Sequence, residues 1–301
     1  MTDTVGSALI RRYVGRRFVA LRNRAGLTQE QAAIALQRAR ATLGRIEDGD
    51  ERVRFRDIDV RGMLELYQAS PQEGEVLLAL TAETRKGRKK SWWRDFTETA
   101  IPAFFTLYVV FEDSAETIRQ YESELIPGLL QTRAYAEQIN RMPPGHIDEE
   151  ETQRRVRVRL ERQSLLTRPR APHLFFVLNE AVLHRPVGGG SVMAEQLGHV
   201  LEATQRVGVS VRVLPWSAGA HGAMGASNTF ALLEFPRGTF TGEPLEPPLA
   251  YVDSLTGAMY LQKPEEVNAY HLVWDDLEKR ALDEAESRTR ITAALKGFTS
   301  A

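Results

Sequence analysis

The sequence of 301 residues contains no cysteine. This absence excludes a disulfide-stabilised scaffold, a cysteine nucleophile and thiolate metal sites, and it is typical of a reducing compartment. No run of about 18 uncharged apolar residues occurs, so the sequence predicts no membrane-spanning helix. The first residues also lack the apolar stretch of a secretory signal. We therefore expect a cytoplasmic protein.

Aromatic residues make up only 8% of the chain, while 43% of the residues are hydrophobic and 26% are charged. These values are ordinary for globular proteins, and they exclude a wholly disordered or fibrous chain. At roughly 150 residues per domain, the length predicts two domains. Each would be long enough to bury its own core.

Acidic residues are scarce in the first 45 residues, although the net charge of the whole chain is only −1. Residues 1–90 carry a net charge of +6, and residues 91–301 carry −7. The first 45 residues alone hold nine arginines and two acidic residues. Such an asymmetry indicates that one part of the chain meets a polyanion. A solvated basic face is the alternative that composition leaves open.

Apolar residues within residues 1–84 recur at helical spacing and predict five short helices. Gly26 is expected to end the first helix. Thr28 and Gln31 form a capping-box pattern at the start of the second helix. The basic run RKGRKK, within residues 85–91, contains no apolar residue, and we interpret it as a linker.

Residues 92–301 mix strands with helices. The predicted fold class is therefore α+β, with an all-α five-helix domain followed by a mixed α/β domain. The order strand, helix, strand over residues 173–216 predicts a parallel pair of strands, and Ser191 is interpreted as the cap of the intervening helix. Strands are expected at residues 173–180, 209–216, 228–235, 249–254 and 258–261. Helices are expected at residues 114–121, 132–140, 149–166, 192–207, 264–282 and 283–296.

Residues 27–49, with the sequence LTQEQAAIALQRARATLGRIEDG, have the pattern of two short helices joined by a tight turn. This segment resembles the helix-turn-helix of the phage-repressor-like, XRE-type regulators, and the spacing matches without gaps. The resemblance implies a DNA-binding domain whose third helix enters the major groove of double-stranded DNA. The matching residues are Leu27, Thr28, Gln29, Glu30, Ala33, Leu36, Thr42, Ile46, Glu47 and Gly49.

The third helix is expected to turn Leu43 and Ile46 inward, which leaves its polar side free to contact DNA. Arginine can bind the O6 and N7 atoms of guanine with two hydrogen bonds, worth about 1–3 kcal/mol of discrimination. Arg40 and Arg45 are the candidates for this contact. The full set of predicted DNA-binding residues is Gln29, Arg38, Arg40, Ala41, Thr42, Arg45, Arg52 and Arg54.

Three of these residues are candidates for contact with the phosphate backbone. The resemblance implies that Gln29, at the N-terminus of the second helix, contacts a phosphate. Arg52 and Arg54 are interpreted either as phosphate contacts or as solvated loop charges. Ala41 and Thr42 could touch a thymine methyl group.

The resemblance also identifies a structural pair and two departures from the family pattern. Arg22 and Glu47 match positions that form an ion pair in relatives. Gln37 stands where the turn between the two helices commonly has glycine, so a residue with a side chain must adopt an unfavourable or altered turn. Ala39 replaces the usual serine cap, which removes a hydrogen bond worth about 1 kcal/mol.

Segments spread over residues 91–295 are similar to a domain of unknown function that commonly follows this helix-turn-helix in bacterial regulators. They include WWRDF, IPGLLQT, RRVRVRLERQ and VLPWSAGAHGAMG. The resemblance implies a regulator encoded beside a small partner protein and connected with development and antibiotic production.

The second half of the chain offers no recognisable catalytic or metal-binding pattern. No two of its histidines have the HExxH spacing, and no nucleophile-elbow sequence occurs, so we expect no enzyme activity, no metal and no cofactor. The segment Ser217–Gly225 consists mainly of small residues, with His221 and Met224 as its only large side chains. Together with Trp216, these two are candidates for binding a ligand or partner. A flexible loop between strands is the alternative.

The sequence as a whole predicts a transcriptional regulator that binds double-stranded DNA as a homodimer. Its C-terminal domain is expected to bind a small-molecule effector or a small protein partner and thereby to shift the DNA-competent population. An antitoxin-like protein that neutralises a small partner is one alternative. An enzyme that uses its helix-turn-helix only for targeting is the other.

Overall fold

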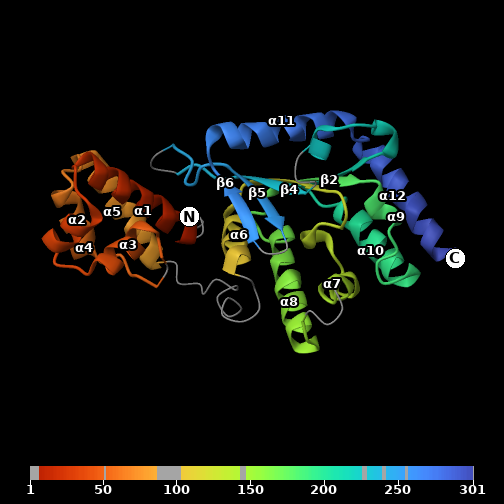
Figure 1. Ribbon diagram of the computed structural model, residues 1–301, viewed down its shortest axis with the longest axis horizontal. Helices are drawn as coiled ribbons and strands as arrows, with labels where there is room; N and C mark the ends of the chain where they lie inside the picture. Colours follow the sequence, from red (N-terminus) through yellow and green to blue (C-terminus); the bar gives the residue numbers. More distant parts are fainter. Residues whose placement is uncertain are drawn as a thin grey trace. The chain divides into compact units, whose positions relative to one another are not determined.

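The chain divides into two compact units, which Figure 1 colours along the sequence. One unit comprises Met1–Lys90 together with Phe235–Pro247, and the other comprises Ser91–Glu234 and Pro248–Ala301. The first is helical and the second contains a mixed sheet, so the fold class is α+β as predicted. Of the predicted linker, residues 87–91 lie outside the described part of the chain. The computed structural model describes residues 7–50, 52–86, 103–142, 147–225, 229–238, 242–254 and 257–300.

Five helices form the described part of the N-terminal unit, as the apolar spacing predicts. Gly26 has a φ of +69° just beyond the end of the first helix. The capping box is confirmed, because the Thr28 hydroxyl accepts the N–H of Gln31 while the Gln31 side chain accepts the N–H of Thr28. The helices are α1 (Ser7–Arg24), α2 (Gln29–Ala35), α3 (Arg40–Glu47), α4 (Asp57–Leu66) and α5 (Pro71–Lys86).

The turn between α2 and α3 has the unfavourable geometry that the sequence indicates. Gln37 adopts a φ of +52°, in the left-handed region that glycine occupies without a steric cost. Ala39 precedes α3 with an extended backbone and provides no side-chain cap. The start of α3 therefore depends on packing against its neighbours more than on local capping.

Gly15 allows α1 to pass directly over the end of α3. A Cβ atom built at this position would lie 2.1 Å from the backbone oxygen of Glu47 and 3.0 Å from that of Ile46. Both are backbone atoms, so neither can move aside as a flexible side chain would. The crossing of α1 and α3 thus requires a residue without a side chain at position 15.

Segment Phe235–Pro247 connects β4 with β5 in the chain but belongs to the N-terminal unit. Glu246 is fully buried there and accepts hydrogen bonds from Arg12 Nε (3.2 Å) and Arg16 Nη1 (2.5 Å). Arg16 Nη2 also donates to the carbonyl oxygen of Leu245 at 2.5 Å. Two of the arginines of α1 therefore bind protein groups.

A six-stranded mixed sheet forms the centre of the C-terminal unit, in the order β3-β2-β1-β4-β5-β6. β1 pairs with β2, and β2 with β3, in parallel, which confirms the predicted parallel pair. The pairs β1–β4, β4–β5 and β5–β6 are antiparallel. The strands are β1 (Thr117–Glu122), β2 (His173–Asn179), β3 (Val209–Leu214), β4 (Phe230–Glu234), β5 (Leu249–Ser254) and β6 (Gly257–Leu261).

Helices cover both faces of this sheet (Figure 1). On one face, Trp274 and Leu277 of α11 share an apolar core with Leu232 of β4. On the other face, the ring of Tyr108 from α6 lies 4.2 Å from that of Tyr251 in β5. Among the described residues, every helix is too short or too polar to cross a bilayer. The α-helices are α6 (Ala103–Ser114), α7 (Arg133–Asn140), α8 (Glu149–Arg162), α9 (Ala181–His184), α10 (Gly190–Ala203), α11 (Pro264–Arg280) and α12 (Glu284–Thr299).

The predicted helix at residues 114–121 is wrong, because this region contains strand β1. Ile118 and Tyr121 are both buried, and their spacing of three residues imitates a helix. They point to opposite faces of the strand, and both faces of the sheet are covered. Burial on two sides thus produced an apolar spacing that a single sequence does not distinguish from a helical one.

Ser191 does not cap the helix that follows it, contrary to the prediction. Helix α10 begins two residues before the predicted start, at Gly190, and its cap position is Gly189, which has a φ of +89° and forms no side-chain cap. The glycines at this point give the chain the conformational freedom to enter the helix early. Ser191 therefore lies inside the first turn.

Candidate functional sites

Helix α3 turns its apolar residues inward and its cationic residues outward. Leu43 and Ile46 are buried against the rest of the N-terminal unit, as predicted. The outward side begins at the N-terminal end of the helix, where the side chain of Arg40 retains 66% of its exposure. The exposed or partly exposed residues on α3 are Arg40, Ala41, Thr42, Gly44 and Arg45.

A hydrogen-bond network fixes the start of α2 against α3. Arg22 donates two hydrogen bonds to Glu47, from Nε to Oε1 at 2.6 Å and from Nη2 to Oε2 at 3.1 Å. They confirm the predicted ion pair. Gln29 Nε2 donates to Glu47 Oε2 (2.9 Å), and Gln29 Oε1 accepts from Arg40 Nε (3.3 Å). The hydrogen bond with Glu47 raises the pKa of Arg22. Gln29 is thus placed beside Arg40.

The other predicted DNA-binding arginines differ in their surroundings. Arg38 Nη2 donates to Asp59 Oδ1 at 2.5 Å, and Arg52 Nη2 donates to Asp50 Oδ2 at 2.7 Å. The hydrogen bond from Arg52 lowers the pKa of Asp50. Arg54 is exposed and has no hydrogen bond or ion pair with any described residue. To bind a phosphate, Arg38 would have to divide its N–H groups between the phosphate and Asp59 or release Asp59, and Arg52 would have to do the same with Asp50.

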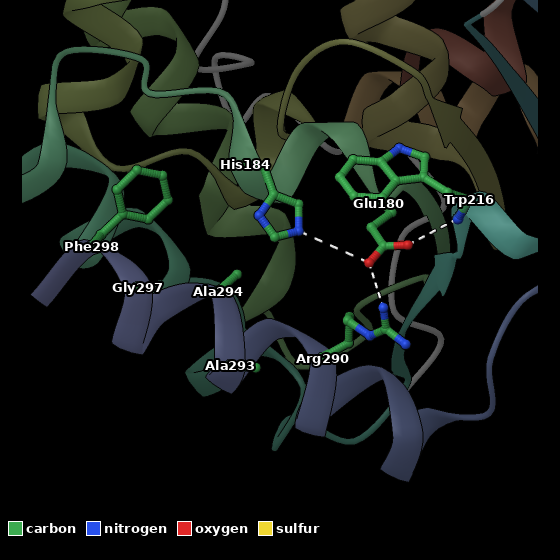
Figure 2. Close-up of a pocket in the computed structure, with 8 residues that line it drawn as sticks. All are labelled: Glu180, His184, Trp216, Arg290, Ala293, Ala294, Gly297 and Phe298. Atoms are coloured by element: carbon green, nitrogen blue, oxygen red, sulfur yellow. Dashed lines mark hydrogen bonds and ion pairs between the residues drawn. The ribbon is translucent and has the colours of Figure 1, made fainter. Parts of the chain in front are cut away.

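A groove of about 590 Å³ lies in the C-terminal unit, at the carboxyl ends of two neighbouring parallel strands (Figure 2). Glu180 directly follows β2, and Trp216 stands two residues after β3. Helix α12 forms the opposite wall. Ligands of open α/β sheets commonly bind at this edge. The residues that line the groove are Glu180, His184, Trp216, Arg290, Ala293, Ala294, Gly297 and Phe298.

Glu180 organises the polar end of the groove. Its side chain is only 3% exposed. Its Oε2 atom accepts the backbone N–H of Trp216 at 2.9 Å, and its Oε1 atom accepts Arg290 Nη1 at 2.5 Å. His184 Nε2 lies 3.9 Å from the same Oε1, and the His184 ring stacks on the Trp216 indole with 5.1 Å between centroids. Both carboxylate oxygens thus have hydrogen-bond donors within the protein, whereas Trp216 is 63% exposed.

Comparison with known families finds two matching regions in the chain. Residues 14–77 match a helix-turn-helix domain. Residues 105–293, more than half of the chain, match a domain of unknown function (DUF5753). The chain belongs to the DUF5753 family. No curated protein and no solved structure matches it significantly.

The two matches confirm the resemblance drawn from the sequence: a helix-turn-helix domain followed by a C-terminal domain of unknown function. A helix-turn-helix domain indicates DNA binding and a regulatory role. The match names no narrower class of helix-turn-helix, so the XRE-type assignment stays a prediction. Among the described residues, no group of acidic, histidine or cysteine side chains is arranged to hold a metal ion.

The other two ligand candidates of the DUF5753 domain, His221 and Met224, do not line the groove. The segment between them packs on α11, because Ala223 belongs to the core and the N–H of Gly222 donates to Asp276 Oδ2 at 2.8 Å. His221 lies edge-on to a tyrosine ring, burial lowers its pKa, and its Nδ1 has no partner among the described residues. Met224 remains 65% exposed.

Sequence reasoning identified Trp216 but missed the rest of the groove. Glu180 ends the segment HLFFVLNE, and an acidic residue directly after a buried parallel strand is a signal that could have been used. Arg290 offers no such signal, because 110 residues separate it from Glu180 in the chain. Only the packing of α12 brings them together.

Proposed function

We propose that the protein is a sequence-specific, DNA-binding transcriptional regulator of the phage-repressor-like, XRE type. The observation that carries the proposal is the division of α3 into a buried apolar side and an exposed cationic side. Arg40 and Arg45 read guanines, while Ala41 and Thr42 contact thymine methyl groups. Gln29, held beside Arg40 by a hydrogen bond, positions the helix on a phosphate. Arg38, Arg52 and Arg54 add phosphate contacts.

The regulator binds its operator as a homodimer, with half-sites about one helical turn apart. Phosphate contacts make the affinity fall steeply with salt concentration. The DUF5753 domain binds an effector, and this binding shifts the DNA-competent population. The groove beside Trp216 supports the effector role, because its volume and its mixed polar and aromatic lining are those of ligand sites. The proposal assigns no catalytic role to the chain.

Selection of genomic DNA fragments by the full-length protein tests this function. The wild type is expected to enrich a two-fold-symmetric site. The double variant Arg40→Ala/Arg45→Ala is expected to bind that site at least roughly 30-fold more weakly, since each lost guanine contact is worth about 1–3 kcal/mol. The control is Arg61→Ala/Arg288→Ala, which removes the same charge from residues outside the predicted DNA-binding set.

Three results would contradict the proposal. One is a wild type that enriches no site, either alone or with the product of a neighbouring gene. Another is a double variant that selects the same site with unchanged affinity. The third is an equal loss of binding in the control, which would show that the loss comes from the change in net charge and not from contacts of Arg40 and Arg45.

A further inference from the structure

We infer that the groove between α12 and the pair His184–Trp216 binds a small aromatic acid, that is, a flat ring system carrying one anionic group. Binding in the groove regulates DNA binding only if the effector role proposed above holds, so the inference rests on the proposed function for this consequence. Three observations carry it: the size of the groove, the shape of its apolar part, and the sign of its accessible charge.

The size of the groove fits a small molecule. Its volume of about 590 Å³ lies within the range of roughly 300–1,000 Å³ that is usual for ligand sites. It also lies at the carboxyl edge of β2 and β3, where ligands of open α/β sheets commonly bind.

The shape of the apolar part fits a flat ring. Helix α12 presents Ala293, Ala294 and Gly297 to the groove, and none of these carries a side chain larger than a methyl group. A Cβ atom built on Gly297 would meet no atom within 4 Å, so the space beside it is open. Figure 2 shows the rings of Phe298 and His184 next to this wall. Small residues beside aromatic rings leave a slot in which a planar ligand can stack.

The accessible charge of the groove is positive. The carboxylate of Glu180 is buried, and both of its oxygens already accept hydrogen bonds. The side chain of Arg290 is 44% exposed and directs one of its five N–H groups to Glu180, which leaves donors for a ligand. Among the residues that line the groove, a ligand cation would therefore meet an exposed guanidinium and no reachable carboxylate. A ligand carboxylate or sulfonate would gain a charge-assisted hydrogen bond.

Calorimetric titration of the full-length protein with three matched probes tests the inference. The probes are 1-naphthoate, its neutral amide 1-naphthamide, and the cationic 1-naphthylmethylamine. The acid is expected to bind at least tenfold more tightly than the amide, and the amine is expected not to bind. Equal affinity for the acid and the amide, tighter binding of the amine, or no binding of the acid would overturn the inference.

Variants locate the binding in the groove. Gly297→Leu should fill the slot and abolish binding while the helix is retained, because the position is sterically open and leucine is the better helix former. Gly198→Leu in α10, which is also sterically open and lies outside the groove, is the control and should bind as the wild type does. Unchanged binding in Gly297→Leu would place the ligand elsewhere and overturn the inference.

A second pair of variants tests the charge. Arg290→Gln is expected to bring the affinity for 1-naphthoate down to that for the amide, whereas Arg288→Gln on the same helix leaves it unchanged. Arg290→Gln also leaves buried Glu180 without its ion-pair partner. If this variant does not fold, the Gly297→Leu titration alone decides the inference. These titrations contain no DNA, and the fragment selection contains no probe, so failure of this inference and failure of the proposed function are distinguishable.

Discussion

At the scale of single residues, Gly15 is the described glycine at which an added Cβ atom would come closest to another atom. Replacing it by alanine places a methyl group 2.1 Å from the backbone oxygen of Glu47, so α1 and α3 must separate. We expect Gly15→Ala to lower the free energy of unfolding by about 1–3 kcal/mol, the usual effect of overpacking. The measurement is urea unfolding followed by circular dichroism.

The matched control is Gly62→Ala in α4. There the new methyl group would lie 3.5 Å from Leu36 Cδ2, which is an ordinary contact. Alanine is the better helix former, so this variant should gain roughly 0.5–1 kcal/mol. A Gly15→Ala variant as stable as this control would show that α1 and α3 do not cross as described.

Glu122, at the end of β1, is a residue through which pH should affect stability. Burial raises the pKa of its carboxyl from 4.5 to about 8, with Asp253 adding to the shift and with Gln120, Thr229 and Arg159 opposing it. The folded state therefore binds this proton more tightly than the unfolded chain does. The resulting stability is complete below about pH 4.5 and is lost as the pH rises to about 8.

Urea midpoints measured between pH 5 and pH 9 check this expectation. The wild type should lose stability across this interval, and Glu122→Gln, which cannot titrate, should lose less. Glu124→Gln, at an exposed position two residues further on, is the control and should keep the wild-type slope. Equal slopes in all three proteins would rule out Glu122 as the titrating group.

At the scale of secondary-structure elements, capping distinguishes the two helices of the DNA-binding motif. α2 has a complete capping box. α3 starts from Ala39, which has the extended backbone of a cap residue but no side-chain oxygen to accept a hydrogen bond. We expect Ala39→Ser to stabilise the N-terminal unit by about 0.5–1 kcal/mol and Thr28→Ala to destabilise it by a similar amount. Thermal unfolding of the two variants beside the wild type measures both. A destabilising Ala39→Ser would mean that the position has no free space for a cap.

Strand β1 shows where element prediction from one sequence fails. Its neighbours in the sheet come from residues 173–179 and 230–234, so its strand character depends on partners far away in the chain. All five predicted strands are present as β2–β6, whereas helices α6 and α9 were missed along with β1. A helix with a clear local cap is predicted more closely, because its hydrogen bonds and its cap lie within four residues. α7 illustrates this: it begins one residue after the predicted start, and the hydroxyl of Thr132 caps it by accepting the N–H of Tyr135.

At the scale of the whole molecule, the segment Phe235–Pro247 makes the N-terminal unit discontinuous in sequence. Glu246→Ala removes the buried carboxylate that binds Arg12 and Arg16. We expect a loss of about 1.5–3 kcal/mol, the usual worth of hydrogen bonds to a charged group, seen as a lower urea midpoint. Glu243→Ala, whose carboxylate is 61% exposed, should change stability by less than about 1 kcal/mol. Equal effects of the two would contradict the burial of Glu246.

The sequence alone was sufficient for features that depend on neighbours along the chain. These are the helix-turn-helix, the capping box of α2 and the inward side of α3. The α+β class and the parallel pairing of β2 with β3 followed from the order of the predicted elements instead. Periodicity, caps and turn residues are local signals, so a single sequence carries them.

The tertiary structure alone decided which distant groups meet. The groove requires Glu180, Trp216 and Arg290 to converge, and the buried Glu246 requires a segment more than 200 residues from α1. Such contacts depend on sheet order and helix packing, for which the sequence contains no local pattern. The helix-turn-helix could therefore be predicted, whereas the groove of the DUF5753 domain emerged only once the strands and α12 were placed together.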